Sequence, residues 1–370
     1  MTDFVVIGGG MAGVSAAAHL APHGSVVLLE AEQTLAAHTT GRSAALFVVN
    51  YGGQASRPLA LASEPFLRHP PEGAGADSLL SSRGALWVAE HGQEEHLRKV
   101  ATEGQASGAG SELIDRDQVL ELVPVLKPDL VAGGLYEPSA MDIDVAALHQ
   151  AFVRLARSHG AEIRTSAPVV ALNGQGSRWS VSTAAETIEC DVVVDAAGAW
   201  GDVVAGLAGI EPIGLEPRRR TAFMVPGDIS YSGWPMVVDI DHRYYFKPDG
   251  VQILCSLAEE DPDLPGDPRP RMEDVALAIE RINRATTLDI RTVNSQWTGL
   301  RTFAPDDDLV IGEEPTAPGF YWLVGQGGTG IMTAPAYGSL LAGLILGSGA
   351  SAEAVAAGVD PSLTDPARFR

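Results

Sequence analysis

The chain has 370 residues, of which 45% are hydrophobic, 19% charged and 6% aromatic, and this composition is typical of a globular enzyme long enough for two domains. Its net charge of −22 creates a field that repels phosphate groups, which argues against nucleic acid and anionic membranes as partners. Only two cysteines are present, no apolar stretch is long enough to span a membrane, and an apolar run follows almost directly after Met1. We therefore predict a cytoplasmic protein without a disulfide framework, a membrane span or a signal peptide.

The first thirty residues have the pattern of a βαβ unit that binds a dinucleotide. Its expected parts are, in chain order, a strand over 3–7, the turn Gly8-x-Gly10-x-x-Gly13, a helix from 11 to about 22, a strand over 26–29 and the acid Glu30. Gly8 permits a tight turn, Gly10 lets the backbone approach a pyrophosphate, and Gly13 lets helix and strand pack closely. The helix N-terminus attracts the phosphates, and Glu30 accepts a hydrogen bond from a ribose hydroxyl. The alternative is a βαβ turn with a purely structural role.

The rest of the chain indicates which dinucleotide is bound. A nicotinamide enzyme usually continues with further βα units, whereas here a polar stretch over 38–45 follows. Downstream, residues 192–200 have the pattern of a buried strand that runs into a turn of small residues. Residues 325–330 are rich in glycine and open a predicted apolar helix from 331 to about 346. Three separated segments with exposed backbone suit a large ligand that lies across one domain.

This arrangement resembles the flavoprotein family of D-amino-acid oxidase, glycine oxidase, sarcosine oxidase and D-arginine dehydrogenase, and the similarity to D-arginine dehydrogenase runs along nearly the whole chain. The resemblance implies an FAD cofactor. Sarcosine oxidases similar to this family tether their flavin covalently, but neither cysteine lies in the region 301–303, so we expect non-covalent FAD. The residues implied to contact FAD are Gly8, Gly10, Met11, Ala12, Gly13, Glu30, Ala31, Thr40, Gly41, Arg42, Ser43, Ala44, Val169, Ala197, Gly198, Trp200, Arg301, Gly327, Gly328, Thr329, Gly330 and Ile331.

The same reading predicts an α/β fold with two interleaved domains. Residues 1–55, 139–217 and 302–370 are expected to form an FAD-binding, Rossmann-like domain of the glutathione-reductase type. Residues 56–138 and 218–301 are expected to form a second, α+β substrate-binding domain built on an antiparallel sheet. The helices predicted beyond the first unit and before the last one cover residues 93–103, 115–123, 144–159 and 272–285.

Oxidation of an amine by a flavin depends mostly on orientation, so groups that anchor the substrate matter more than a strong base. An amino acid is best anchored by an arginine, because the guanidinium fork matches two carboxylate oxygens. The stretch 297–303 resembles the family motif for the substrate carboxylate and assigns this role to Arg301; the alternative is a surface arginine beside the acids 306–308. Arg220 ends a run of three arginines that alternate sides of a strand, and by resemblance it faces the active site.

Two tyrosines complete the predicted catalytic set. Tyr245 matches a family tyrosine whose hydroxyl donates to the substrate carboxylate, and its neighbour Tyr244 points the other way if the segment is a strand. Tyr51 matches a family tyrosine near the substrate and the flavin. Without the resemblance, each would be interpreted as a core aromatic residue. We expect the other two arginines of the run, Arg218 and Arg219, to be solvated or paired with acids.

The predicted substrate pocket is formed by Leu46, Val48, Ala85, Met236 and Met332. By comparison with D-arginine dehydrogenase, four positions change from polar to apolar: a histidine becomes Leu46, a threonine Val48, a glutamate Ala85 and a glutamine Met332. A buried guanidinium without an acid partner is costly. We therefore predict an apolar D-amino acid or a secondary amine as the substrate, and D-arginine and D-lysine as poor substrates.

The predicted reaction is hydride transfer from the substrate α-carbon to FAD, which gives an imino acid that water converts to a 2-oxo acid and ammonia. No motif indicates whether oxygen or a quinone is the electron acceptor that reoxidises the flavin. Three alternatives stay open: a glycine- or sarcosine-type secondary amine oxidase, a 2-hydroxy-acid dehydrogenase, and a non-catalytic FAD-binding subunit. The loss of the family histidine at Leu46 argues against the hydroxy acid. The nine histidines lack metal-ligand spacing, so we predict no catalytic metal.

Overall fold

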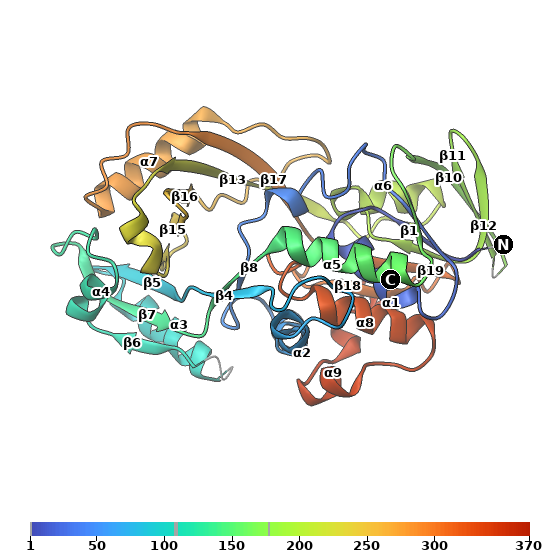
Figure 1. Cartoon of the computed structure of the whole chain (residues 1–370), viewed down its shortest axis with the longest axis horizontal. Coiled ribbons are helices and arrows are strands. Elements are labelled where there is room, and N and C mark those ends of the chain that lie inside the picture. The colour runs from blue at the N-terminus through green and yellow to red at the C-terminus, as the bar shows by residue number, and fades with distance from the viewer. Residues whose placement is uncertain (1, 107–109, 177) are drawn as a thin grey trace.

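The computed structural model describes residues 2–106, 110–176 and 178–370, and it contains two eight-stranded sheets and one small sheet. Figure 1 shows the elements of the two large sheets in opposite halves of the long axis, with both chain termini in the half that holds the first sheet. The first half combines blue, green and red segments, and the second combines cyan, yellow and orange ones. Each half is therefore assembled from stretches that are far apart in the sequence.

The first sheet is centred on the strand that leads into the glycine-rich turn. β1 (Thr2–Ile7) pairs in parallel with β2 (Val26–Leu29) on one side and with β12 (Thr187–Asp195) on the other. The order is β10-β11-β12-β1-β2-β9, with β19 also beside β12 and β18 beside β19. The remaining strands are β9 (Glu162–Arg164), β10 (Val169–Gln175), β11 (Arg178–Thr183), β18 (Val310–Glu313) and β19 (Phe320–Val324). The parallel strands end at one edge, which is where ligands bind in such sheets.

Helices cover both faces of this sheet. α1 (Met11–Leu20) begins directly after the glycine turn and packs against α5 (Val145–Ser158) and α8 (Ala334–Ile345). α6 (Gly201–Leu207) contributes to the core on the opposite face. α2 (Ser56–Arg68) and α9 (Ala352–Ala356) pack on the side of α8. The short 3-10 turns are η1 (Thr40–Arg42), η2 (Gly198–Trp200), η3 (Ile229–Gly233), η4 (Pro361–Leu363) and η5 (Pro366–Phe369).

The second sheet has the order β17-β13-β16-β15-β14-β5-β7-β6. Its strands are β5 (Ala85–Glu90), β6 (Glu112–Ile114), β7 (Val131–Glu137), β13 (Glu216–Pro226), β14 (Met236–Asp239), β15 (Tyr245–Asp249), β16 (Gln252–Ser256) and β17 (Ser295–Phe303). All pairs are antiparallel except β5 with β14, which come from separate stretches of the chain and meet in parallel. The sheet is therefore mixed at the place where the two stretches join, and antiparallel elsewhere as predicted.

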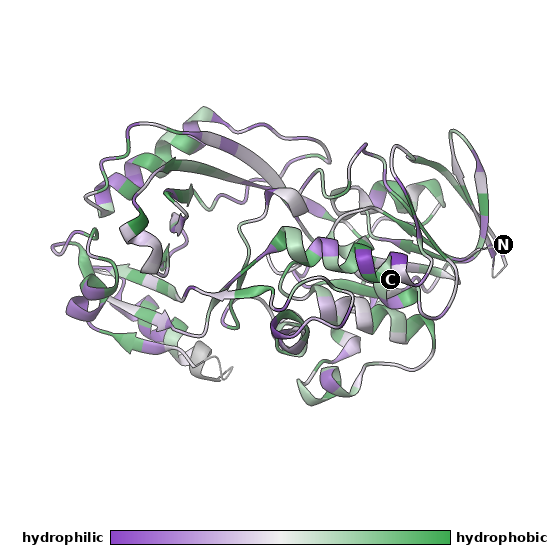
Figure 2. Ribbon diagram, viewed as in Figure 1, coloured by the Kyte–Doolittle hydropathy of each residue, from purple (hydrophilic) through white to green (hydrophobic). Residues whose placement is uncertain are grey.

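Three further helices lie in the second half, and a small sheet packs against the core of the first sheet. The helices are α3 (Glu94–Ala106), α4 (Arg116–Leu122) and α7 (Met272–Ala285). The strands of the small sheet are β3 (Leu46–Phe47), β4 (Leu80–Ser82) and β8 (Met141–Ile143). α7 is amphipathic, which Figure 2 shows as green and purple around one helix, and it buries Val275, Ala278 and Ile282 against the second sheet.

Apolar side chains form a core on each face of both large sheets. In the second sheet, successive residues alternate between the two cores: Tyr244 and Phe246 face α7, whereas Tyr245 faces the other side. That other core also contains Val48 and Ala85, and it faces the pocket described below. Pleating therefore decides which strand residues reach the pocket.

Most predicted helices are confirmed, and two features of the prediction change. α3, α4, α5 and α7 lie where helices were expected, but the start expected at residue 331 is wrong, because α8 begins at Ala334. The residues just before α8 form turns, and Gly327 among them has a φ of 51°, which favours glycine. The helix begins where Pro335 can occupy its first turn. α2 was not predicted. Because it packs with α8 in the core of the first sheet, it favours a domain boundary after residue 68, and the other domain limits stay predictions.

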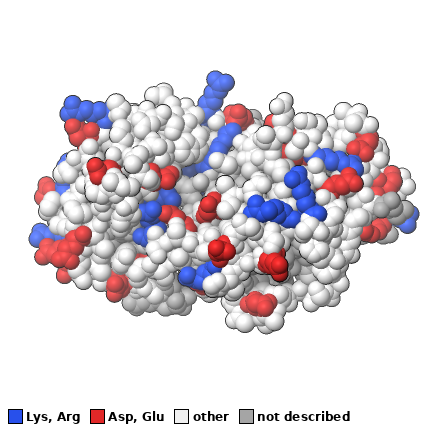
Figure 3. Space-filling model, in the orientation of Figure 1, with Lys and Arg blue, Asp and Glu red and all other residues white. Residues whose placement is uncertain are grey.

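Surface charge and helix length bear on two other expectations. On the face seen in Figure 3, acidic and basic side chains are interspersed, so the net charge of −22 is not gathered into one acidic patch there. In the described ranges, no helix is long and apolar enough to cross a membrane. The same residues contain no group of three or more histidines, cysteines and acids arranged to hold a metal ion.

Candidate active site

A pocket of about 880 Å³ extends from the carboxyl edge of the first sheet to the inner face of the second. Ligand and cofactor sites usually occupy roughly 300–1,000 Å³. The predicted residues that line it are Gly8, Gly10, Met11, Ala12, Glu30, Ala31, Thr40, Arg42, Ser43, Ala44, Leu46, Val48, Tyr51, Ala85, Val169, Ala197, Gly198, Trp200, Arg220, Met236, Tyr245, Arg301, Gly327, Gly328, Gly330, Ile331 and Met332. Gly13, Gly41 and Thr329 were also predicted but do not line it.

The part of the pocket around Gly8, Gly10, Glu30 and Thr40 is called the dinucleotide end here. Gly8 has a φ of 110°, which favours glycine, and a Cβ there would lie 2.5 Å from the carbonyl oxygen of Ala196. A Cβ on Gly13 would overlap the carbonyl oxygen of Gly8. Gly13 therefore shapes the turn from behind, which explains why it does not line the pocket.

Polar groups surround the N-terminus of α1. The carboxylate of Glu30 accepts the amides of Gly9 at 2.6 Å and Glu32 at 2.8 Å, and its oxygens keep acceptor positions for a ribose hydroxyl. The Met11 amide donates to Thr40 Oγ1 at 2.9 Å. The N-cap residue Gly10 has no side chain to cap this helix end, and the Thr40 hydroxyl takes only the first amide of α1. Amides and a partial positive charge are thus available for a phosphate.

His38 lies beside the dinucleotide end. Its Nε2 is 3.0 Å from Glu32 Oε1, and its ring centre is 4.8 Å from a ring centre of Trp200. His38 Nδ1 is buried and has no partner among the described residues. A buried nitrogen without a partner is costly, so it is suited to hydrogen bond with a ligand in this pocket.

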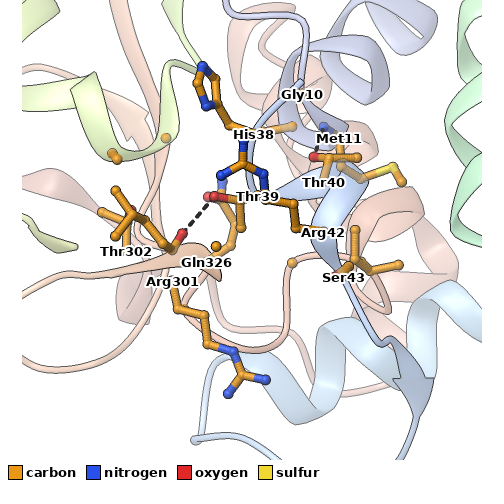
Figure 4. A pocket seen from close by; sticks show the side chains of 18 of the residues that line it. Gly10, Met11, His38, Thr39, Thr40, Arg42, Ser43, Arg301, Thr302 and Gln326 are labelled. Atoms are coloured by element: carbon orange, nitrogen blue, oxygen red, sulfur yellow. Dashed lines mark hydrogen bonds between the residues drawn. The ribbon is translucent and has the colours of Figure 1, made fainter. Parts of the chain in front are cut away.

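The segment around η1 ties the dinucleotide end to the second sheet. Thr39 Oγ1 donates to the Leu300 carbonyl at 2.7 Å. Arg42 donates to the Thr298 carbonyl at 2.8 Å and pairs with an exposed acid, Asp267, at 2.5 Å. Figure 4 shows Arg301 extending away from Arg42 and Thr39, toward the other part of the pocket.

That other part is the anchor end, defined by Tyr51, Arg220, Tyr245 and Arg301. In the ladder of β13 and β17, Arg218 lies opposite Arg301, and Arg220 follows two positions along. Arg220 and Arg301 therefore lie on the same face of two neighbouring strands. Both line the pocket, and their roles toward a substrate stay predictions.

The other two arginines of the run pair with acids, as expected. Arg219 points to the opposite side of β13, is buried, and pairs with Asp263 at 2.5 Å. Arg218 pairs with Glu216 at 2.5 Å and with Asp307 at 3.1 Å. Their charges are therefore neutralised locally.

The two tyrosines contact the two arginines. Arg301 Nη1 donates to the hydroxyl of Tyr51 at 3.2 Å. The guanidinium carbon of Arg220 lies 6.0 Å from the ring centre of Tyr245. These groups come from β13, β15, β17 and the loop after β3, so the fold brings together four residues that are far apart in sequence.

The wall next to the anchor end is apolar. Leu46, Val48, Ala85, Met236 and Met332 all line the pocket. Ala85 and Met236 pair across β5 and β14, and Val48 and Met332 are buried. None of the five side chains offers an acid to a cationic substrate group.

Sequence reasoning missed several polar residues that line the pocket, among them Glu260, His242 and Tyr337. Burial, together with the charge of Arg220, lowers the pKa of His242, so its ring is neutral at neutral pH. The buried Tyr337 hydroxyl has no partner among the described residues. His242 and Glu260 are placed by turns and irregular segments of the second sheet, Tyr337 is placed by α8, and no motif encodes these positions.

Glu137 on β7 lies behind the apolar wall and is fully buried. Its Oε1 accepts the Val49 amide at 3.1 Å, while Oε2 has no partner in the described part of the chain. Burial raises the pKa of Glu137 to about 7, although hydrogen bonds from Val49 and Asn50 oppose the shift. Glu137 thus holds the backbone just before Tyr51.

The fold and the pocket define a dinucleotide-binding protein in which residues of both large sheets line the ligand pocket. The glycine turn, the free helix end and Glu30 fit a pyrophosphate and a ribose, and the pocket continues far enough to reach the anchor end. The chain belongs to the family of FAD dependent oxidoreductases, whose model matches residues 3–344. The cofactor of this family is FAD, and the glycine turn and Glu30 fit it.

Individual relatives agree with this assignment. Human mitochondrial sarcosine dehydrogenase is 25% identical over 363 residues, which cover 93% of this chain and 39% of that protein. Glycine oxidase of Bacillus licheniformis is 24% identical over 365 residues, which cover 94% of this chain and 93% of that protein. The solved L-proline dehydrogenase of P. horikoshii has the same fold, with a TM-score of 0.87 at 22% identity over 100% of this chain and 97% of that one. The chain spans 39–40% of the length of several curated relatives.

Proposed function

We propose that the protein oxidises a small amine that carries a carboxylate. The observation that supports this proposal is the convergence of Tyr51, Arg220, Tyr245 and Arg301 at the anchor end. Guanidinium and hydroxyl donors together suit a carboxylate, which accepts several hydrogen bonds at once. The family supports the reaction type, which is oxidation with FAD.

FAD held at the dinucleotide end would supply the hydride acceptor for oxidation of the substrate α-carbon. Arg301 binds the carboxylate, and Tyr51 fixes the guanidinium through the hydrogen bond of 3.2 Å. Arg220 on β13 and Tyr245 on β15 also bind the substrate. His242 is neutral at neutral pH and so adds no charge near the amine. The imino product leaves and is hydrolysed to a 2-oxo acid and ammonia.

We propose an apolar D-amino acid as the preferred substrate. The five wall residues offer apolar contacts to a hydrocarbon side chain, which gains free energy when it leaves water. A cationic side chain would be buried beside the wall without an acid from it. D-leucine, D-methionine and D-phenylalanine are therefore expected to react better than D-arginine.

A second candidate is an N-methylated glycine. It is favoured by the sarcosine dehydrogenase and glycine oxidase relatives, each of which aligns with more than nine tenths of this chain. Such a substrate would use the same carboxylate anchors, but it would leave much of the apolar wall without a contact.

The test is anaerobic reduction of the purified yellow holoenzyme. The flavin absorbance is followed after mixing with D-leucine, L-leucine, D-arginine, glycine, sarcosine and a 2-hydroxy acid. We expect D-leucine to reduce the flavin about tenfold faster than D-arginine or L-leucine, because only D-leucine fits both the anchors and the wall. Air is then admitted, and the rate of reoxidation separates oxygen from a quinone as the acceptor.

Each other result has a defined meaning. Faster reduction by D-arginine contradicts the role of the wall. Reduction by sarcosine alone supports the second candidate, and reduction by the hydroxy acid alone contradicts amine oxidation. If none of these compounds reduces the flavin, the proposed function is wrong for all of them.

A further inference from the structure

A bulge in the second sheet directs an acid toward the anchor end. β13 and β16 pair regularly where Ala222 lies opposite Ser256, and pairing with the same side of β13 resumes where Arg218 lies opposite Pro262. Four steps along β13 thus correspond to six steps along its partner, so two extra residues are accommodated between the pairs. Bulges change the direction of side chains and occur beside active sites. Here the bulge brings Glu260 into the pocket.

The backbone on both sides of Glu260 is held in place. The Thr221 amide donates to the carboxylate of Glu259, and the Arg219 amide donates to the Asp261 carbonyl at 2.8 Å. These bonds replace the regular ladder within the bulge. The fixed backbone of the bulge therefore helps to direct the Glu260 side chain, together with the arginines that it contacts.

Glu260 lies against both anchor arginines. Its Oε1 is 2.7 Å from Arg220 Nη2 and 3.9 Å from Arg301 Nη1. The side chain keeps 43% of its surface exposed, so it is not a buried structural ion. The Glu260 carboxylate is therefore accessible to a ligand at the anchor end.

Glu260 also sets the charge of the anchor end. Of the described residues that line this end, Arg220 and Arg301 are positive and Glu260 is negative, while His242 is neutral at neutral pH. Two positive charges and one negative charge leave a net charge of +1, which a single carboxylate neutralises. A second carboxylate on the ligand would lie near Glu260, where like charges repel.

We propose that Glu260 determines specificity by restricting the anchor end to ligands with one carboxylate. The proposal rests on the proposed function, because it takes the ligand to be a carboxylate-bearing amine. Without Glu260, the two arginines would present a net charge of +2 and would fit a dicarboxylate such as iminodiacetate or D-glutamate. Repulsion of the wrong ligand is a common source of such discrimination.

The first experiment measures binding without turnover. Butyrate and succinate have similar length and carry one and two carboxylates, and each is titrated into oxidised holoenzyme while the flavin spectrum is recorded. We expect wild type to bind butyrate about tenfold or more tightly than succinate, and Glu260→Gln to reduce or invert that ratio by about tenfold. The ratio of kcat/KM for sarcosine and iminodiacetate, which differ by one carboxylate, is expected to change in the same direction.

Two further variants separate charge from structure. Glu260→Asp keeps the negative charge and is expected to keep most of the discrimination. Asp261→Asn removes an exposed acid that pairs with Arg271 at 2.7 Å, so it serves as the matched control and should leave the ratio unchanged. FAD content and thermal unfolding are measured for every variant.

Three kinds of result would overturn the proposal, and a fourth would overturn only the proposed function. If Glu260→Gln weakens both ligands equally, Glu260 only positions Arg220. If the ratio does not change, or changes as much in Asp261→Asn, the local charge of Glu260 does not discriminate. If wild type binds neither ligand, the anchor end is not a carboxylate site. If the ligands discriminate as expected but no amine reduces the flavin, only the proposed function fails.

Discussion

The two ends of the pocket are built in different ways. The dinucleotide end consists mainly of backbone: a glycine turn, a helix N-terminus and one acid, all within the first βαβ unit. The anchor end consists of long side chains from three strands and a loop, and it is complete only when the second sheet has formed. The difference teaches that a cofactor site made of local backbone can be read from a motif, whereas a substrate site made of distant side chains depends on strand register.

The largest expected effect follows from adding a side chain where α1 packs against the glycine turn of the dinucleotide end. Gly13→Ala places a Cβ against the carbonyl oxygen of Gly8, so α1 cannot pack on the turn. We expect destabilisation on the order of 4 kcal/mol and loss of most bound FAD. The ratio of flavin to protein and the thermal unfolding midpoint measure both effects.

A glycine in open surroundings provides the control. A Cβ on Gly206, in α6, would meet no atom within 4 Å. Gly206→Ala is therefore expected to keep its FAD and its stability. If Gly13→Ala also keeps FAD, the close packing behind the turn is not needed for cofactor binding, and the contrast between the two ends disappears.

The next effect concerns the anchor end alone. Arg301→Gln leaves the backbone of the dinucleotide end unchanged but removes the charge that we propose pairs with the substrate carboxylate. We expect kcat/KM to fall by about 10²–10³, with FAD content close to that of wild type. Arg291→Gln, which removes an exposed arginine paired with Asp289, is expected to have no effect. Loss of FAD from Arg301→Gln would mean that the two ends are not separable.

These contrasts explain how far the sequence predicts the molecule. The glycine motif, Glu30 and the helices with strong caps were predicted because their signals lie within a few residues. Arg301 and Tyr245 required the family resemblance, because nothing local distinguishes them from surface or core residues. Glu260 was not predicted, since its position depends on a bulge between β16 and the following segment. The start of α8 was misplaced because apolar composition does not reveal the turns ahead of Ala334.

A smaller effect tests the support behind the anchor end. Burial raises the pKa of Glu137 from its ordinary 4.5 to about 7, so the folded state binds its proton more tightly than the unfolded state. The free energy of unfolding should therefore fall as pH rises through this window and level off above it. Glu137→Gln mimics the protonated acid and removes this dependence. Between pH 5 and pH 8, wild type should lose roughly 2–3 kcal/mol relative to the variant.

Denaturant unfolding at several pH values measures this difference. The free energy of unfolding of the variant is subtracted from that of wild type at each pH. This difference removes the contribution of other groups, such as Asp195, whose pKa is also raised by burial. Glu72→Gln, at an exposed acid, should follow wild type at every pH. Parallel curves for Glu137→Gln and wild type would show that Glu137 is ionised in the folded state throughout this range.

The smallest effect compares two neighbouring tyrosines at the anchor end. Tyr245 lies on the pocket side of β15, and the adjacent Tyr244 faces the opposite core. Tyr245→Phe removes the hydroxyl that we propose donates to the substrate, so kcat/KM is expected to fall by about five- to tenfold, or roughly 1 kcal/mol. Tyr244→Phe removes the same atom on the other face and is expected to leave kcat/KM unchanged. Since the two residues differ by one step along a strand, equal effects would mean that the hydroxyl acts through stability and not through the substrate. If only Tyr244→Phe lowers kcat/KM, the strand orientation that places Tyr245 at the anchor end is wrong.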